Sequence, residues 1–385
     1  MKSIHNKDIT PADLERPDHA LRKRFLFFRA NHRHLFGSQE GVDIDLLFRN
    51  HLAAKEEAPK LYDPENLAYA MANYRIVDEY GVLAMATQQA VMVSSFHFGP
   101  YNLLGAILSN EGVHFSVLAN GAKYFEQMKA YQMEKAEANE LKHGPVVLTD
   151  EDVINPRDFT TMIKMMHKIR EGKSMLVYAD GLEGQGGYFE RSRMEIVPFL
   201  GRKIYARKGT ASLAYKLKLP IVFAMVEREE AGFVVRFFPV LQPEEYADRA
   251  SFVSTYCKLG YKHLESYVTS APEQWEIFDR LHVWLAEEDL VEQAGGLLTE
   301  RPVPEWCQFN KARFGDFVEN ELHYLLDMHT RQVTGLSPGI SELLRRIDGT
   351  RSSVVAEVLP DETFNQLFNR GILISSGARA QSAAA

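Results

Sequence analysis

Between residues 90 and 240, apolar runs of strand length alternate with segments of helical spacing, and this alternation constrains the fold more than any other feature. A short apolar run bounded by polar or turn-forming residues is typical of a buried strand. The pattern therefore predicts an α/β domain. The expected strands lie at 91–94, 115–118, 146–148, 174–178, 221–226 and 233–238, and helices at 159–171 and 209–217 lie among the segments between them.

Composition excludes several classes of protein. The chain has 385 residues and a net charge of −8, from 44 basic and 52 acidic residues, so it lacks the basic balance of a nucleic-acid-binding protein. Its two cysteines, Cys257 and Cys307, lie far apart and without metal-ligand spacing. We therefore expect no disulfide framework, no metal site and no nucleic-acid partner, and we expect the reducing cytoplasm as the location.

The N-terminal segments bear on contact with a membrane. The first eight residues have no apolar core and do not predict a signal peptide, and no run reaches the roughly 18 apolar residues of a membrane span. Residues 21–36 interleave Arg and His with Phe and Leu. They predict a helix that either packs its aromatic stripe on the core or touches lipid or an acidic carrier, and the lipid contact would place the protein at the periphery of the inner membrane.

Shifts in composition divide the chain into five regions. We expect an N-terminal helical region at 1–80, an α/β domain at 81–290, a linker rich in Pro and Gly at 291–304, a small module at 305–377 and a disordered tail at 378–385. Because the module has its own apolar pattern behind a linker, we expect it to fold as a unit.

The most informative stretch for function is the one around His97. This histidine follows the apolar run at 91–94, and Gly99-Pro100 signals a turn and the start of a helix. An imidazole at such a strand end can act as a general base, while the amide groups of the following helix stabilise negative charge. The alternative is a histidine that only satisfies hydrogen bonds at the end of a strand.

A second block of polar residues follows the run at 174–178, where Asp180-Gly181 ends the expected strand. The glycine-rich loop at 184–187 comes next, and it matches neither the Walker A nor the dinucleotide-binding fingerprint. Further on, Gly209 starts an expected helix beside four basic residues, which either bind a phosphate or phosphopantetheine arm or form a solvated loop. The basic residues are Arg202, Lys203, Arg207 and Lys208.

Taken in order, these blocks resemble the lysophospholipid acyltransferase superfamily, and within it the bacterial lipid A late acyltransferases. The resemblance covers roughly residues 85–285 and implies a mixed sheet flanked by helices, as in glycerolipid acyltransferases. It rests on motifs in the order of the family: His97-x4-Asn102, Asp180-Gly181, Val197-Pro198-Phe199-Leu200-Gly201-Arg202, Gly209-Thr210-Ala211, Leu219-Pro220-Ile221-Val222 and Ala271-Pro272-Glu273-Gln274-Trp275.

The resemblance implies acyl transfer from a thioester to a hydroxyl or an amine. In the family motif His-x4-Asp/Glu the histidine deprotonates the acceptor and the acid orients the imidazole, so His97 and Asn102 are the expected catalytic residues. An amide can orient an imidazole but cannot neutralise its charge, and Asp180 or Glu183 are the candidates for that role. The residues expected to bind substrate are Gly99, Asp180, Phe199, Gly201, Arg202, Arg207, Lys208 and Gly209.

The C-terminal module is expected to be a small winged-helix-like α+β domain. A strand at 317–327, a turn at 329–331 and helices at 337–347 and 361–369 make up the pattern. The module more weakly resembles the winged-helix domains that bind leader peptides in peptide natural-product pathways. That resemblance implies docking of an extended peptide on a strand edge. The alternative is that the periodic leucines form the core of the module.

We expect a cytoplasmic acyltransferase without metal or cofactor, whose donor is an acyl thioester of acyl carrier protein or coenzyme A. Because the membrane anchor typical of lipid A acyltransferases is not recognised, the favoured acceptor is a small molecule or peptide of a secondary-metabolite or modified-peptide pathway, carried by a carrier protein or free. The alternatives are a peripheral-membrane lipid acyltransferase of the lipid A or lysophospholipid type and a non-catalytic relative that binds acyl groups or peptides.

Overall fold

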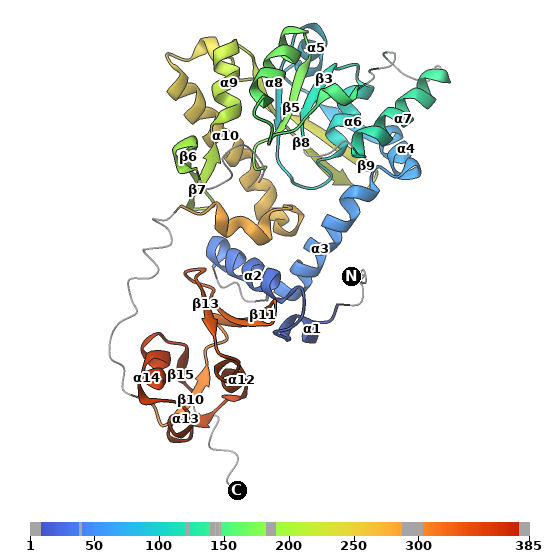
Figure 1. Cartoon of the computed structure of the whole chain (residues 1–385). Coiled ribbons are helices and arrows are strands. Elements are labelled where there is room, and N and C mark those ends of the chain that lie inside the picture. The colour runs from blue at the N-terminus through green and yellow to red at the C-terminus, as the bar shows by residue number, and fades with distance from the viewer. Residues whose placement is uncertain are drawn as a thin grey trace. The chain divides into compact units, whose positions relative to one another are not determined.

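The computed structural model describes residues 9–37, 41–119, 123–138, 143, 146, 148–181, 190–286 and 303–376. The expected tail, the glycine-rich loop, Glu183 and most of the expected linker lie outside these residues. The chain divides into two compact units, one of residues 49–278 and one that joins residues 1–48 to residues 279–385 (Figure 1). The grouping joins the first helices to the C-terminal part, whereas the sequence predicted a separate N-terminal region.

The larger unit is built on a sheet that has seven strands among the described residues. These strands are β1 (Tyr74–Val77), β2 (Met92–Ser95), β3 (Phe115–Leu118), β4 (Val153–Ile154), β5 (Ser174–Tyr178), β8 (Ile221–Glu229) and β9 (Gly232–Phe237). Their order is β1-β9-β8-β2-β5-β3-β4, and all neighbours are parallel except β8 and β9. The expected mixed α/β sheet is confirmed.

Helices flank this sheet, and a two-stranded hairpin accompanies it (Figure 1). The helices are α3 (Ile44–Lys60, from residue 49 onward), α4 (Pro64–Ala72), α5 (Val82–Gln88), α6 (Leu103–Asn110), α7 (Lys123–Glu137), α8 (Thr161–Arg170), α9 (Gly209–Leu217) and α10 (Arg249–Ser270), and the hairpin is β6 (Met194–Phe199) with β7 (Arg202–Arg207). The apolar faces of α4, α5 and α6 meet those of the strands in one continuous core, which holds the sheet rigid.

The register of the central strands positions the site. Strand β2 pairs in parallel with β5, where Ser95 lies opposite Tyr178, and with β8, where Ser94 lies opposite Phe223. Parallel neighbours end at the same edge of a sheet, so the residues that follow β2 and β5 emerge side by side. The fold thereby brings His97 and Asp180 to one place.

The strands of this unit differ from the expectation in three places. No strand forms at the described residues of 146–148; the sheet instead ends at the two-residue strand β4, which the sequence analysis did not predict. The edge strand β1 was missed in the same way. Helix α10 ends at Ser270 and a 3₁₀ turn at Pro272–Gln274 follows, because Pro272 lacks the N–H that a continued helix would need.

The smaller unit combines N-terminal helices with antiparallel strands and helices from the C-terminal part of the chain. Its elements are α1 (Pro11–Glu15), α2 (Arg22–Phe36), β10 (Trp306–Phe309), β11 (Phe314–Glu319), β12 (Leu322–Asp327), β13 (Val333–Leu336), α12 (Pro338–Arg346), β14 (Thr350–Arg351), α13 (Ser352–Val358), α14 (Asp361–Asn369) and β15 (Leu373–Ser375). A single strand at 317–327 is wrong: Asn320 and Glu321, with φ of 50° and 65°, turn the chain between β11 and β12. The winged-helix assignment stays a prediction.

Helix α2 is a core element of this unit. Phe25, Leu26 and Phe28 have no exposed surface, and Leu26 and Phe27 pack on the β11–β12 sheet against Phe317. The aromatic stripe of residues 21–36 is therefore not available to a membrane, and the alternative of lipid contact through it is wrong. In the described part of the chain, the helices are all too short or too polar to cross a bilayer.

Candidate active site

His97 is hydrogen-bonded to a buried carboxylate at the carboxyl edge of the central sheet. Its Nδ1 lies 2.8 Å from Asp180 Oδ1, and its backbone N–H donates to both carboxylate oxygens at 3.1 Å. Asp180 is fully buried, whereas the imidazole is 23% exposed. The carboxylate thus fixes the ring at one nitrogen and leaves its other side accessible.

Trp275 provides the second anchor of the carboxylate. Its indole Nε1–H donates to Asp180 Oδ2 at 2.7 Å, and the indole is buried. The residues on both sides of Trp275 hold the histidine turn: the Glu276 N–H donates to the His97 carbonyl at 2.8 Å, and the Gly99 N–H donates to the Gln274 carbonyl at 3.0 Å. These bonds fasten the segment after α10 to the loop after β2.

Two tyrosines enclose the imidazole. The ring centroids of Tyr101 and Tyr178 lie 4.8 and 4.7 Å from that of His97. The hydroxyl of Tyr178 donates to the Tyr101 carbonyl at 3.1 Å, and that of Tyr101 donates to Glu276 Oε2 at 2.5 Å. Because both rings are held by their hydroxyls, the imidazole has little freedom to rotate away from the carboxylate.

The charges around the imidazole favour its protonated form. Burial acts to lower the pKa of His97, but the charge and the hydrogen bond of Asp180, with a smaller contribution from Glu276, outweigh burial and raise the pKa above its ordinary value. An ion pair with a carboxylate stabilises the imidazolium that forms when the ring takes up a proton.

This geometry suits proton abstraction from a nucleophile. Asp180 accepts a hydrogen bond from Nδ1, which assigns the tautomer whose Nε2 carries a lone pair. The imidazole side chain keeps 23% of its surface exposed. A histidine oriented in this way by a buried acid is the arrangement of a general base in acyl transfer.

Asn102 does not take the orienting position that the motif spacing predicted. Its Nδ2 donates to the carbonyl of Ala58 in α3, and its buried Oδ1 has no hydrogen-bond partner among the residues that the structure describes. Asp180 makes the bond to the imidazole in its place. The amides expected to stabilise negative charge are also engaged, since the N–H groups of Leu103 and Leu104 bond back to the carbonyls of Pro100 and Tyr101.

Three of the residues expected to bind substrate shape a turn or pack in the core. Gly99 has φ of +60°, and a Cβ there would lie 3.2 Å from the Val226 carbonyl, so the histidine turn needs glycine. Gly201, with φ of +74°, closes the β6–β7 hairpin. Phe199 is buried and packs its ring on Trp275 at 5.4 Å, which supports the indole that holds Asp180.

The four basic residues do not form one cluster. Arg202 and Lys203 lie at the hairpin end of β7, while Arg207 and Lys208 lie at its other end, about 17 Å along the strand. Gly209 begins α9 as expected, directly after Lys208. Burial lowers the pKa of Arg207, which stands next to the core and not on a cationic surface. A single anion site made by all four residues is therefore wrong.

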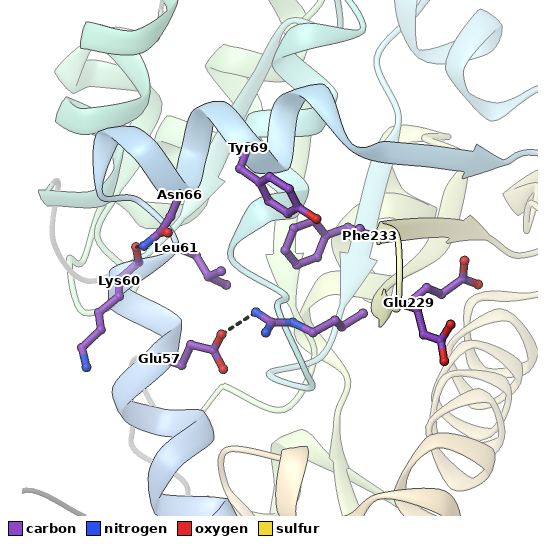
Figure 2. A pocket seen from close by; sticks show the side chains of 10 residues that line it. Glu57, Lys60, Leu61, Asn66, Tyr69, Glu229 and Phe233 are labelled. Atoms are coloured by element: carbon purple, nitrogen blue, oxygen red, sulfur yellow. Dashed lines mark hydrogen bonds and ion pairs between the residues drawn. The ribbon is translucent and has the colours of Figure 1, made fainter.

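Three cavities share Arg228, the last residue but one of β8, as part of their lining. They have volumes of about 280, 370 and 250 Å³, and the third borders Gly99 and Pro100. Arg228 pairs with Glu57 of α3 at 2.5 Å, and both residues line the first and the third cavity. Figure 2 shows the side chains that line the first cavity, Glu57 among them. These cavities put space for a ligand on the same sheet edge as His97.

Sequence reasoning found His97 and named Asp180, but it missed the residues that support them. Trp275 was noticed only as the end of a proline-to-aromatic motif. No sequence feature marked Tyr101, Tyr178 or Glu276, because a single sequence does not show which side chains converge on one imidazole.

Two of three comparisons with known proteins found a similar protein or family. The chain matches the model of the family "Bacterial lipid A biosynthesis acyltransferase" over residues 76–283. No curated protein gives a significant match. Among solved structures, the 1-acyl-sn-glycerophosphate (LPA) acyltransferase PlsC from Thermotoga maritima is similar at 12% identity, over 64% of this chain and 95% of that one, with a TM-score of 0.31.

Proposed function

The chain belongs to the bacterial lipid A biosynthesis acyltransferase family, and on that premise we propose that it transfers a fatty acyl group from a thioester donor to a hydroxyl group of a lipid. The donor is an acyl thioester of acyl carrier protein or coenzyme A. The observation that carries the proposal is the His97–Asp180 pair, a base held by a buried acid at an accessible sheet edge.

The reaction needs one proton to move twice. His97 Nε2 takes the proton of the acceptor hydroxyl while its oxygen attacks the thioester carbonyl carbon. The carbon–sulfur bond then breaks, and the imidazolium returns the proton to the leaving sulfur, so the products are an ester and a free thiol. Asp180 stabilises the imidazolium between these steps.

Family membership changes which class of acceptor is favoured. The sequence alone favoured a small molecule or peptide of a secondary-metabolite pathway and held a lipid acceptor as the alternative. The family match supports the lipid. The peptide-docking role of the C-terminal module lies outside the matched residues and stays a prediction.

The cavities at Arg228 are the proposed place of the lipid. The one beside the histidine turn is lined by Ala53, Ala54 and Ala58 of α3 and by Leu61, which follows this helix, and these apolar side chains suit a hydrocarbon chain. Charged side chains also line it, among them Glu57, Arg228 and Glu273. A lining that is partly apolar and partly charged matches an amphiphilic acceptor.

Donor and acceptor can be tested in one experiment. The protein is incubated with acyl carrier protein and coenzyme A thioesters of several chain lengths, with a detergent-dispersed lysophospholipid or lipid A precursor, and with a free amino acid as the competing acceptor. Intact-mass spectrometry follows loss of thioester and gain of acylated product. We expect acylated lipid; acylation of the amino acid alone would contradict the lipid acceptor, and no turnover with any pair would contradict the function.

A further inference from the structure

An exposed apolar stripe runs along α8 of the larger unit. Phe159 is 96% exposed, Ile163 57% and Met162 47%, and the half-buried Met166 continues the same helix face. Thr161 and Met165 of the same helix are buried, so α8 presents apolar side chains both to the core and to the outside. A contiguous exposed apolar stripe on one helix marks an interaction surface.

The turn that presents Phe159 is held by several hydrogen bonds. Thr161 Oγ1 donates to the carbonyls of Asn155 and Asp158 at 2.7 and 2.6 Å, and the Arg157 N–H donates to Asn155 Oδ1 at 2.9 Å. Lys164 forms an ion pair with Asp158 at 2.9 Å across the same turn. Exposure of the phenyl ring is therefore a property of an ordered turn.

The stripe starts at the sheet edge that carries the candidate active site. The chain leaves β4 at Ile154 and reaches Phe159, just as it leaves β2 for His97 and β5 for Asp180. Strands β4, β3, β5 and β2 are parallel neighbours, so these exits share one edge, about 14 Å apart from β4 to β2. A surface that receives Phe159 would therefore lie at the sheet edge that carries His97.

We propose that this stripe docks the protein on the surface of an anionic phospholipid bilayer, with Phe159 and Ile163 inserted among the lipids. The proposal rests on the proposed function, since a lipid acceptor has to reach His97 from a membrane. Charge is compatible with it: α8 has no acidic residue, and Arg170 at its end has no acidic partner in the part of the chain that the structure describes. A side chain as exposed as Phe159 suits insertion into lipid.

An acyl carrier protein is the competing occupant, because carrier proteins are acidic. The arrangement favours lipid over it. Lys168 is engaged by Glu151 and Asp152, and Lys164 by Asp158, so few positive charges are left for an acidic protein. The stripe is mostly apolar, as expected for a side that enters a bilayer.

Vesicle co-sedimentation of the full chain tests the surface without requiring catalysis. The vesicles contain phosphatidylethanolamine and phosphatidylglycerol, with pure phosphatidylcholine as the uncharged comparison. We expect the double variant F159E/I163E to bind the anionic vesicles at least tenfold more weakly than the parent. The matched control Y80E/L259E adds the same charge at two exposed apolar positions outside the stripe, and we expect its binding to stay within twofold of the parent.

A second variant reports insertion directly. We expect the added fluorescence of F159W to be quenched by brominated phospholipids in the anionic vesicles. No binding by the parent, equal weakening by the stripe and control variants, or loss of acyl carrier protein binding with unchanged vesicle binding would each overturn the proposal. F159E/I163E should keep parental turnover with detergent-dispersed acceptor, so a lack of acyl transfer by the parent would refute the proposed function alone.

Discussion

At the scale of single residues, the site depends on a contact that no local sequence pattern predicts. His97 and Asp180 are 83 positions apart and become partners because β2 and β5 are neighbouring parallel strands. The sequence predicted the histidine from its place after an apolar run. The resemblance to the family motif assigned the orienting role to Asn102 and left Asp180 as a candidate to supply the missing charge, because the true partner follows from strand order, which one sequence does not reveal.

Asp180→Asn should change the pH dependence of the reaction. A general base works only when unprotonated, so activity rises with pH through the pKa of His97. Asp180 holds that pKa above its ordinary value of about 6.5, and loss of its charge should move the acidic limb of kcat/KM to lower pH. We expect kcat to fall by about 10²–10⁴ because the imidazolium loses its counter-ion. An unmoved limb in the measured pH–rate profile would show that Asp180 does not set this pKa.

Asn102→Asp should not improve the enzyme, although it restores the family motif. The Asn102 Nδ2 donates to the Ala58 carbonyl, and a carboxylate oxygen there would face another acceptor. We expect a loss of about 1–3 kcal/mol in the free energy of unfolding, measured by denaturant titration, with no gain in kcat/KM. A higher kcat/KM at unchanged stability would mean that residue 102 does reach the imidazole in the working enzyme.

At the scale of elements, apolar runs with clear boundaries were predictable and very short elements were not. The bounds of β3, β5, α9 and α14 agree with the residues expected from the sequence. The two-residue strand β4 has no periodicity to detect, and its place in the sheet depends on its pairing with β3. The turn at Asn320–Glu321 was missed because the apolar pattern continues on both sides of it.

The packing of α10 on the sheet can be tested at Gly260. A Cβ at this position would lie 2.3 Å from the Phe223 ring of β8, which is itself buried. We expect Gly260→Ala to lower the free energy of unfolding by about 1–3 kcal/mol through overpacking. In the control Gly339→Ala, on α12, the new methyl group meets nothing within 4 Å, and a neutral or slightly stabilising effect is expected. Equal melting temperatures for Gly260→Ala and the parent would contradict this packing.

At the scale of the whole molecule, the two units are not two consecutive stretches of sequence. The smaller unit takes α2 from the beginning of the chain and its strands from the end, and Leu26 and Phe27 pack there against Leu326. Sequence patterns group residues that follow one another in the chain, so they predicted an N-terminal region and an independent C-terminal module. The family match at 76–283 covers most of the larger unit.

Removal of residues 296–385 should therefore damage solubility. It would uncover the side of α2 that is buried against Phe317, Leu326 and Met328. We expect the truncated chain to aggregate, as seen by size-exclusion chromatography, whereas removal of residues 377–385 alone should leave a soluble protein. A soluble, monodisperse chain ending at residue 295 would instead support the independent module predicted from the sequence.

The central claim, that His97 is the base of an acyltransferase, is tested most directly by thioester consumption in the parent and in His97→Ala. The protein is incubated with an acyl thioester donor and a lipid acceptor, and the released thiol is measured over time. We predict that the rate of thioester consumption is about 10²–10⁴-fold lower in His97→Ala, while its melting temperature stays close to that of the parent. Transfer at the parental rate by a folded His97→Ala protein would contradict the account.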